Sequence, residues 1–141
     1  MTRLRFLALP AVLAFAAAAA ACSNNSTTTP TPTTPTTFTE VFSGTITVNG
    51  AASHAFIAQG SGTVSLALTA LTPDAANPIG IALGTWTGAA CQVVIANDKA
   101  VQGSTVAGAV GSSGSLCARA YDVGNVVAGT PVSYEFTVTH P

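Results

Sequence analysis

The chain has 141 residues, of which only nine are charged, four basic and five acidic. Arg3 and Arg5 lie within an apolar leader, so the chain after the leader has a net charge of −3. Affinity for nucleic acid depends on clustered basic residues, and this composition therefore excludes a nucleic-acid partner. The length allows one domain of ordinary size, and the frequent apolar residues argue against a disordered chain.

Residues 1–21 have the three parts of a secretory signal. A short positive region is followed by the apolar stretch Phe6–Phe15 and by small residues up to Cys22. The apolar stretch is short for a membrane span, which needs about 20 residues. The segment resembles a bacterial lipoprotein signal, whose lipobox places small residues directly before an obligatory cysteine. Here Ala19–Ala21 precede that cysteine.

The resemblance implies that Cys22 carries a diacylglycerol thioether, that the leader is removed, and that the new N-terminus is acylated. Several acyl chains give stable membrane anchoring, whereas a single chain is marginal. Ser23 at the next position implies sorting to the outer membrane in a cell with two membranes. The alternative is an ordinary signal that is cleaved after the same alanines.

Residues 22–37 form a predicted tether. Between Ser26 and Thr37, eight of twelve residues are Thr and three are Pro. This composition has no apolar side chain to bury and favours an extended chain of about 3.1 Å per residue, a reach of about 45 Å. An unmodified spacer is the preferred interpretation, and an O-glycosylated stalk is the alternative.

Residues 38–141 show a hydrophobic period of two, which is typical of half-buried strands. The alternating or apolar runs are FSGTITV, HAFIA, GTVSLALTAL, IGIAL, CQVVIA, STVAGAV, SLCARAY and PVSYEFTVTH. Turn residues such as Asn49-Gly50, Pro73-Asp74 and Gly124-Asn125 separate them. About eight short strands at this spacing predict an all-β, antiparallel β-sandwich.

The chain has three cysteines, and lipidation of Cys22 leaves an even pair. Cys91 and Cys117 lie in two of the predicted strands, and a disulfide is the expected state of such a pair in an exported protein. The alternative is a pair of unpaired or metal-bound thiols, but no CxxC spacing supports it.

The order of the strand motifs resembles the bacterial pre-peptidase C-terminal domain, a small jelly-roll-like β-sandwich. The resemblance rests on FSGTITVNGAASHAFIAQGSGTVSLALTAL, IGIALGTW, GSLCARAYDVG and VSYEFTVTH. It places Arg119 and Tyr134 at the family's strand arginine and closing tyrosine. It implies a non-catalytic domain of the kind that accompanies secreted hydrolases. Only Asp74 and Asn77 remain of the acidic cluster that often precedes the IGIAL strand.

Trp86, Arg119 and Tyr121 are the candidate ligand-binding residues. Trp86 could stack on a sugar ring, but a plug at the sandwich edge beside the disulfide is the preferred interpretation. Arg119 alternates with inward residues, so it should face outward beside Tyr121 and pair across strands with a carboxylate such as Glu135.

No catalytic residue, cofactor or metal site is expected. His54 is predicted to lie in solvent at a strand start, and His140 lies next to the last residue, so that replacing both should leave the fold unchanged. The acidic and amide residues near turns are interpreted as turn formers and not as a calcium site. These residues are Asp74, Asp98, Asp122, Asn77, Asn97 and Asn125.

The sequence thus predicts a lipid-anchored, non-catalytic protein of the cell envelope. Its expected partners are the membrane, through the anchor, and a glycan or an envelope protein, for surface display, adhesion or binding. The alternative is an accessory carbohydrate-binding or hydrolase-associated module.

Overall fold

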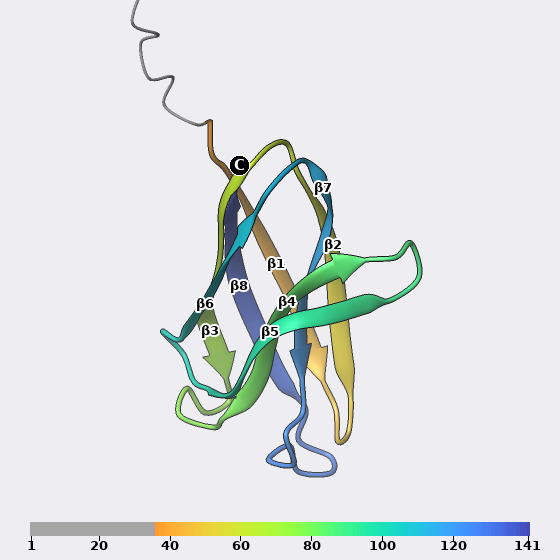
Figure 1. Cartoon of the computed structure of the whole chain (residues 1–141). Helices are drawn as coiled ribbons and strands as arrows, with labels where there is room; N and C mark the ends of the chain where they lie inside the picture. Colours follow the sequence, from red (N-terminus) through yellow and green to blue (C-terminus); the bar gives the residue numbers. More distant parts are fainter. Residues whose placement is uncertain (1–35) are drawn as a thin grey trace, which may run out of the picture. The chain divides into compact units, whose positions relative to one another are not determined.

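The computed structural model describes residues 36–141, which form eight β-strands (Figure 1). In chain order these are β1 (Phe38–Ile46), β2 (Ala51–Ala58), β3 (Gly62–Thr72), β4 (Ile79–Trp86), β5 (Cys91–Ala100), β6 (Thr105–Val110), β7 (Gly114–Tyr121) and β8 (Val132–His140). The predicted all-β fold is confirmed. In this part of the chain no helix is long and apolar enough to cross a membrane. The predicted leader, the lipidation site Cys22 and most of the tether lie outside the described residues.

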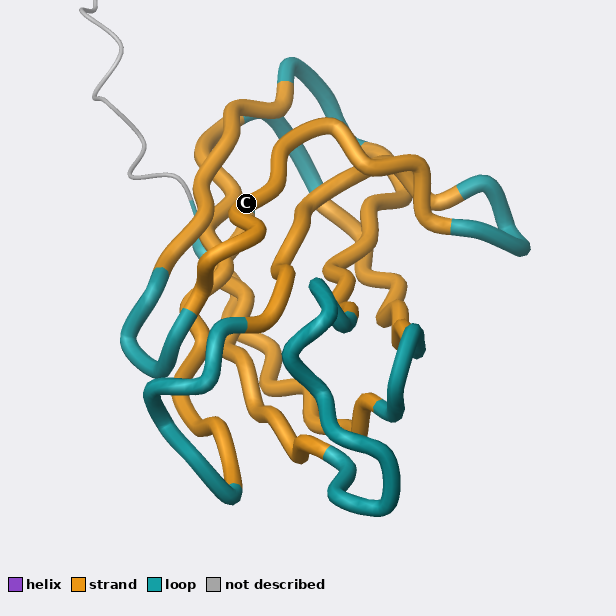
Figure 2. Tube along the Cα trace, turned by 90° about the horizontal axis from the view of Figure 1, so that it is seen from below, coloured by secondary structure: helices purple, strands orange, loops and turns teal. Residues whose placement is uncertain are grey.

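The strands form two four-stranded sheets with antiparallel pairing throughout. Sheet A has the order β1-β8-β3-β6, and sheet B has the order β2-β7-β4-β5. The chain therefore runs as a long double ribbon, in which β1 pairs with β8, β2 with β7, β3 with β6 and β4 with β5. This is the jelly-roll arrangement. Figure 2 shows the loops that join the strands, and the connection between β7 and β8 covers residues 122–131.

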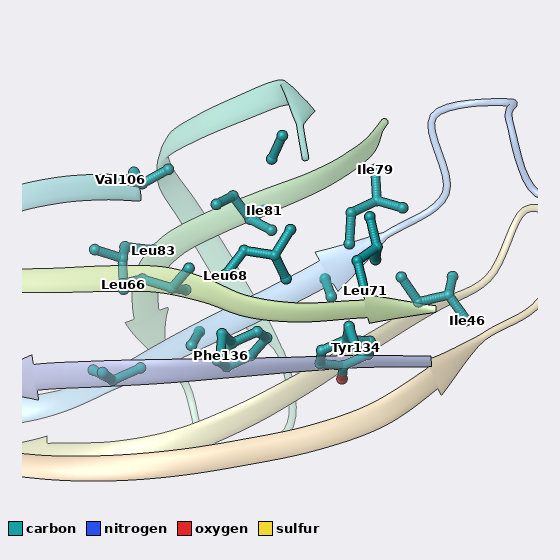
Figure 3. Packing of buried hydrophobic residues seen from close by; sticks show 14 of the residues in the cluster. Ile46, Leu66, Leu68, Leu71, Ile79, Ile81, Leu83, Val106, Tyr134 and Phe136 are labelled. Atoms are coloured by element: carbon teal, nitrogen blue, oxygen red, sulfur yellow. The ribbon is translucent and has the colours of Figure 1, made fainter. Parts of the chain in front are cut away.

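The core lies between the two sheets and is built from the inward phase of each strand. Leu66 and Leu68 from β3, Ile79 and Ile81 from β4, and Phe136 from β8 are fully buried there (Figure 3). Each such side chain stabilises the fold by about 1.5–3 kcal/mol relative to an exposed position. These buried residues follow the alternation of the runs GTVSLALTAL, IGIAL and PVSYEFTVTH.

In the run FSGTITV the alternation continues from Ile46 to Val48, but of these two only Ile46 is buried. Val48 is 43% exposed, because β1 ends at Ile46 and a turn follows. In this turn Asn49 has a φ of 55° and the Gly50 amide donates to the Thr47 carbonyl oxygen at 2.8 Å. The alternation of buried and exposed side chains ends at this turn, where the backbone of Asn49 adopts the left-handed conformation.

Two glycines each lie beneath a tyrosine on the neighbouring strand. Gly44 pairs with Tyr134 across sheet A, and a Cβ at Gly44 would stand 2.6 Å from the Tyr134 hydroxyl oxygen. Gly80 pairs with Tyr121 across sheet B, and a Cβ at Gly80 would overlap the Tyr121 ring. An aromatic ring that lies across a strand glycine covers backbone that would otherwise be exposed.

Cys91 and Cys117 form the predicted disulfide, with an S–S distance of 2.07 Å and Cα atoms 5.7 Å apart. Cys91 begins β5 and Cys117 lies in β7, and β4 runs between these two strands. Gly84 of β4 pairs with Cys117 on one side and with Val93 of β5 on the other. The disulfide therefore bridges across β4 on the outer face of sheet B.

Gly84 permits a close approach of β5 to β4. A Cβ at Gly84 would overlap the carbonyl group of Gln92, and the β4–β5 register shifts between Leu83 and Gly84. Beyond this point the β4–β5 hairpin projects from the body of the sandwich (Figures 1 and 2). A bulge and a strand glycine are the usual means by which a ribbon bends sharply.

Replacing Gly84 with alanine is expected to destabilise the domain by about 2 kcal/mol or more, because backbone atoms of β5 must move. The matched control is Gly60→Ala, since a Cβ at Gly60 meets no atom within 4 Å. Its effect should stay within about 1 kcal/mol. Urea unfolding of both variants under non-reducing conditions measures the difference. Equal stability of the two variants would contradict the close approach at Gly84.

Candidate binding face

The outer face of sheet B has a floor of small side chains from which Arg119 and Tyr121 project. Paired residues on antiparallel strands point to the same face of a sheet. The register neighbours of these two residues on β2 and β4 are all small: Ser53, Ala82, Ala51 and Gly80. Arg119 and Tyr121 are therefore the large side chains at the centre of this face.

Tyr121 is fixed in position by two contacts. Its ring lies on Gly80, and its hydroxyl donates a short hydrogen bond to Oδ1 of Asp98 in β5. Burial, together with the hydrogen bond and the charge of Asp98, raises the pKa of Tyr121 to about 12, against the smaller opposing effect of Arg119. The phenol therefore stays protonated near neutral pH and acts as a donor.

Arg119 faces outward beside Tyr121, as predicted, with its Cζ atom 5.8 Å from the centroid of the ring. This distance is that of a cation–π contact. The predicted pair with Glu135 is wrong, because β8 belongs to sheet A and Oε1 of Glu135 accepts a hydrogen bond from Thr69. Nε of Arg119 is buried and has no hydrogen-bond partner among the described residues.

A polar hollow lies beside Tyr121 at one end of sheet B. Its lining combines carboxylate, ammonium, phenol and amide groups from β5, β7, the β3–β4 loop and the β7–β8 loop: Pro78, Asp98, Lys99, Tyr121, Asp122, Val123 and Asn125. Such a mixture of donors and acceptors suits a ligand that carries hydroxyl groups. The sequence indicated Tyr121 but not Lys99 or Pro78, because the hollow joins strands that are distant in sequence.

Asp122 shapes the rim of this hollow. Its Oδ1 accepts hydrogen bonds from the amides of Gly124, Asn125 and Val126, and its Oδ2 accepts one from Asn49. Burial alone would raise the pKa of Asp122, but these four backbone hydrogen bonds outweigh it and hold the pKa below the ordinary value. The carboxylate is thus a structural group.

Asp74 acts in the same way, but the interpretation as turn formers was wrong for Asn97 and Asp98, which lie within β5; the carboxylate of Asp98 accepts the Tyr121 hydroxyl. Oδ1 of Asp74 accepts from the Ala76 amide at 2.9 Å, and Oδ1 of Asn97 accepts from the Lys99 amide at 3.0 Å. These are side-chain-to-backbone bonds of the kind expected at turns. Within residues 36–141 no three His, Cys, Asp or Glu side chains are grouped as metal ligands would be.

Trp86 does not line the polar hollow. It ends β4, is half-buried, and pairs directly with Cys91 of the disulfide. The structure thus brings Arg119 and Tyr121 together and places Trp86 beside the disulfide.

His54 does not lie in solvent, and that prediction was wrong. His54 is half-buried, and its ring packs against side chains of β1 and β8, stacked on Phe42 at a centroid distance of 5.0 Å and edge-on to Phe136 at 5.4 Å. Nε2 and the Tyr134 hydroxyl oxygen share a hydrogen bond of 2.8 Å. The sequence held the signal, because His54 lies in the same strand phase as the buried residues Phe56 and Ala58.

His140 is also a core residue, with 2% of its surface exposed. Its Nε2 lies 3.0 Å from Oε1 of Glu40 in β1, and its ring lies 5.0 Å from that of Phe56. The prediction that both histidines can be removed without cost is therefore wrong. His140 continues the buried phase of β8 by one more residue.

A second hollow, apolar and of about 170 Å³, lies where the edge strands β5 and β6 meet. Phe56, Val64, Val94, Ile95 and Leu116 are among the side chains that line it. Val94 is 75% exposed there. This hollow has no polar side chain of the kind that fixes a ligand's orientation apart from Thr85.

No protein-family model matches this sequence, and a comparison with curated proteins finds no significant similarity. The resemblances to lipoprotein signals and to the pre-peptidase C-terminal domain therefore stay predictions.

The stability of the domain is expected to rise with pH through the titration of His54. Burial lowers the pKa of His54 from 6.5 in the folded protein. The unfolded chain therefore binds a proton at higher pH than the folded chain does, and the free energy of unfolding increases as the pH rises through the interval below 6.5.

Denaturant unfolding between about pH 5 and pH 8 measures this slope. His54→Gln should be less stable than the wild type at the upper pH and should show a flatter dependence. Asp122 does not interfere, because its pKa lies below 3.8. An unchanged slope in the variant would show that His54 is not the titrating group.

Proposed function

We propose that this chain is an exported, lipid-anchored, non-catalytic protein that presents the outer face of sheet B to a ligand at the cell envelope. The signal-like leader, Cys22 and the Thr/Pro tether support the export and the anchor. An extended tether of this length would hold the domain tens of ångströms from the membrane surface.

The observation that carries the binding role is the polar hollow beside Tyr121. It is preorganised, because Tyr121 is held by Gly80 and Asp98, and Asp122 fixes the adjoining loop through four amides. Groups that are already in place bind a ligand without a further cost in conformational entropy.

A non-catalytic role is favoured by how the titratable side chains are used. His54 and His140 are engaged with Tyr134 and Glu40 between the strands. Asp122 has both oxygens on backbone amides. A general acid or base needs a side chain that can reach a substrate proton.

The second candidate is an accessory carbohydrate-binding module that works beside a separate hydrolase. The mixed donors and acceptors of the hollow favour this role as well. The two candidates differ in the partner, since an accessory module should raise the activity of a hydrolase on an insoluble polysaccharide.

Replacing Cys22 with serine is expected to abolish lipid modification and to release the protein from the membrane. The thiolate is the group that accepts the lipid, and serine lacks it. Metabolic labelling with a radioactive fatty acid and partition between detergent and aqueous phases measure the two effects. Cys91→Ser with Cys117→Ser is the control that should keep the label. A labelled Cys22→Ser protein would contradict the lipoprotein assignment.

The purified full chain is expected to bind at least one polysaccharide or envelope protein through the polar hollow. A glycan array and an array of purified envelope proteins provide the measurement. Asp98→Asn should weaken the interaction, because Asp98 lines the hollow. Glu135→Gln is the matched control on sheet A and should bind as the wild type does.

If no glycan and no envelope protein binds, the proposed binding role is refuted. Equal weakening by Asp98→Asn and Glu135→Gln would place the site elsewhere.

A further inference from the structure

We propose that the ring of Tyr121 is a stacking platform for a neutral pyranose, a sugar ring with equatorial hydroxyl groups, in the polar hollow at one end of sheet B. This inference rests on the proposed binding role of that hollow and names its ligand class. It assigns the flat face of the sugar to the tyrosine ring and the hydroxyl groups of the sugar to the charged side chains around it.

The first argument is the orientation of the Tyr121 ring. Tyr121 belongs to β7, but its hydroxyl donates a hydrogen bond to Asp98 of β5, and β4 runs between these two strands. The ring passes over Gly80 of β4, because a Cβ at Gly80 would overlap Cε2 and Cζ of the ring. The side chain therefore lies across the sheet, with one side of the ring against Gly80 and the other side directed away from the strands.

The second argument is that a ligand can reach the ring. Tyr121 is partly exposed and lines the polar hollow, whereas Gly80 beneath it is buried. The Cζ atom of Arg119 lies 5.8 Å from the ring centroid. Carbon atoms in contact are roughly 3.5–4.0 Å apart, so the guanidinium flanks the ring and does not stack on its centre.

The third argument is that the ring is held in place before a ligand binds. Gly80 supports the ring from below, and Asp98 holds the hydroxyl at its far end. A fixed aromatic ring offers contact area at a low cost in conformational entropy. The C–H groups of a pyranose pack well on such a surface, because the face of an aromatic ring carries negative charge density.

The fourth argument concerns the polar groups around the ring. Asp98 uses Oδ1 for the Tyr121 hydroxyl, so Oδ2 can accept a sugar hydroxyl, and Lys99 can donate to one. The lining has one ammonium group against two carboxylates, those of Asp98 and Asp122, which disfavours an anionic ligand. An apolar ligand would bury these charges without hydrogen bonds. A neutral ligand with several hydroxyl groups fits this combination.

The experiment uses the purified full chain and cellohexaose, a neutral oligomer of β-linked glucose whose ring hydroxyls are all equatorial. Calorimetric titration should show binding. Saturation-transfer NMR from the protein to the sugar should then give the ring hydrogens of one pyranose face at least about twice the saturation of those on the other face, because a stacked ring contacts the protein with one face. Both measurements use the wild-type protein and do not depend on whether a variant folds.

Tyr121→Leu keeps an apolar side chain over Gly80 but removes the aromatic face, and it should weaken cellohexaose binding by at least about fivefold. Tyr121→Phe keeps the ring and should keep most of the affinity. The matched control is Trp86→Leu, which removes an aromatic side chain of the same sheet that does not line the hollow, and it should bind as the wild type does. Near-ultraviolet circular dichroism confirms that each variant is folded.

A wild-type protein that does not bind cellohexaose would overturn the proposal, as would equal saturation of the two sugar faces. Wild-type affinity in Tyr121→Leu would also overturn it, and so would equal losses in Tyr121→Phe and Tyr121→Leu, because the hydroxyl and not the ring face would then make the contact. If the arrays still show another ligand that depends on Asp98, the binding role of the hollow survives and only the ligand class is wrong. If they show none, both fail.

Discussion

On the outer face of β4, from Gly80 to Gly84, no side chain is larger than a methyl group. The positions of Tyr121, Arg119 and β5 on sheet B depend on this constraint. The ring of Tyr121 lies in the space left by Gly80, and the backbone of β5 lies in the space left by Gly84. Ala82, fully buried between them, adjoins Arg119. A larger side chain in this row would displace the tyrosine, the arginine or the hairpin that bears the disulfide.

The opposite edge of the sandwich, between β1 and β2, is closed by histidines instead of aliphatic residues. His54 shares the edge with Phe42 and Tyr134, and His140 shares it with Phe56 and Glu40. Nε2 of each histidine has a hydrogen-bond partner there, as buried polar atoms usually do. Because burial lowers the pKa of His54, its aromatic packing is at its most favourable when the ring is neutral.

The fold could be predicted from the sequence because strand alternation is a local signal. Leu66, Leu68, Ile79 and Phe136 each lie where the period of two places them. The disulfide followed from the number of cysteines and the inferred export. The partner of Arg119 could not be predicted, because whether two strands share a sheet is decided by topology. Glu135 is near Arg119 in sequence but lies on the other sheet.

The contacts at the candidate site could not be predicted for the same reason, because they depend on which strands are neighbours. Asp98 and Tyr121 are 23 residues apart, and nothing in their local sequence shows that they meet. The predictions for the two histidines failed for a different reason. His54 and His140 each continued a buried phase that was already visible, and their polar side chains were given more weight than their position.

The disulfide has a consequence for how the protein withstands proteolysis. The closed loop from Cys91 to Cys117 contains β5 and β6, the edge strands of the two sheets, together with the exposed turns near Gly103 and Ser112. Exposed turns are the usual sites of cleavage. A single cut at either turn would leave both new ends covalently tied to the same domain. The nicked chain would keep its eight strands together, and only a second cut or reduction of the bond would let a piece leave.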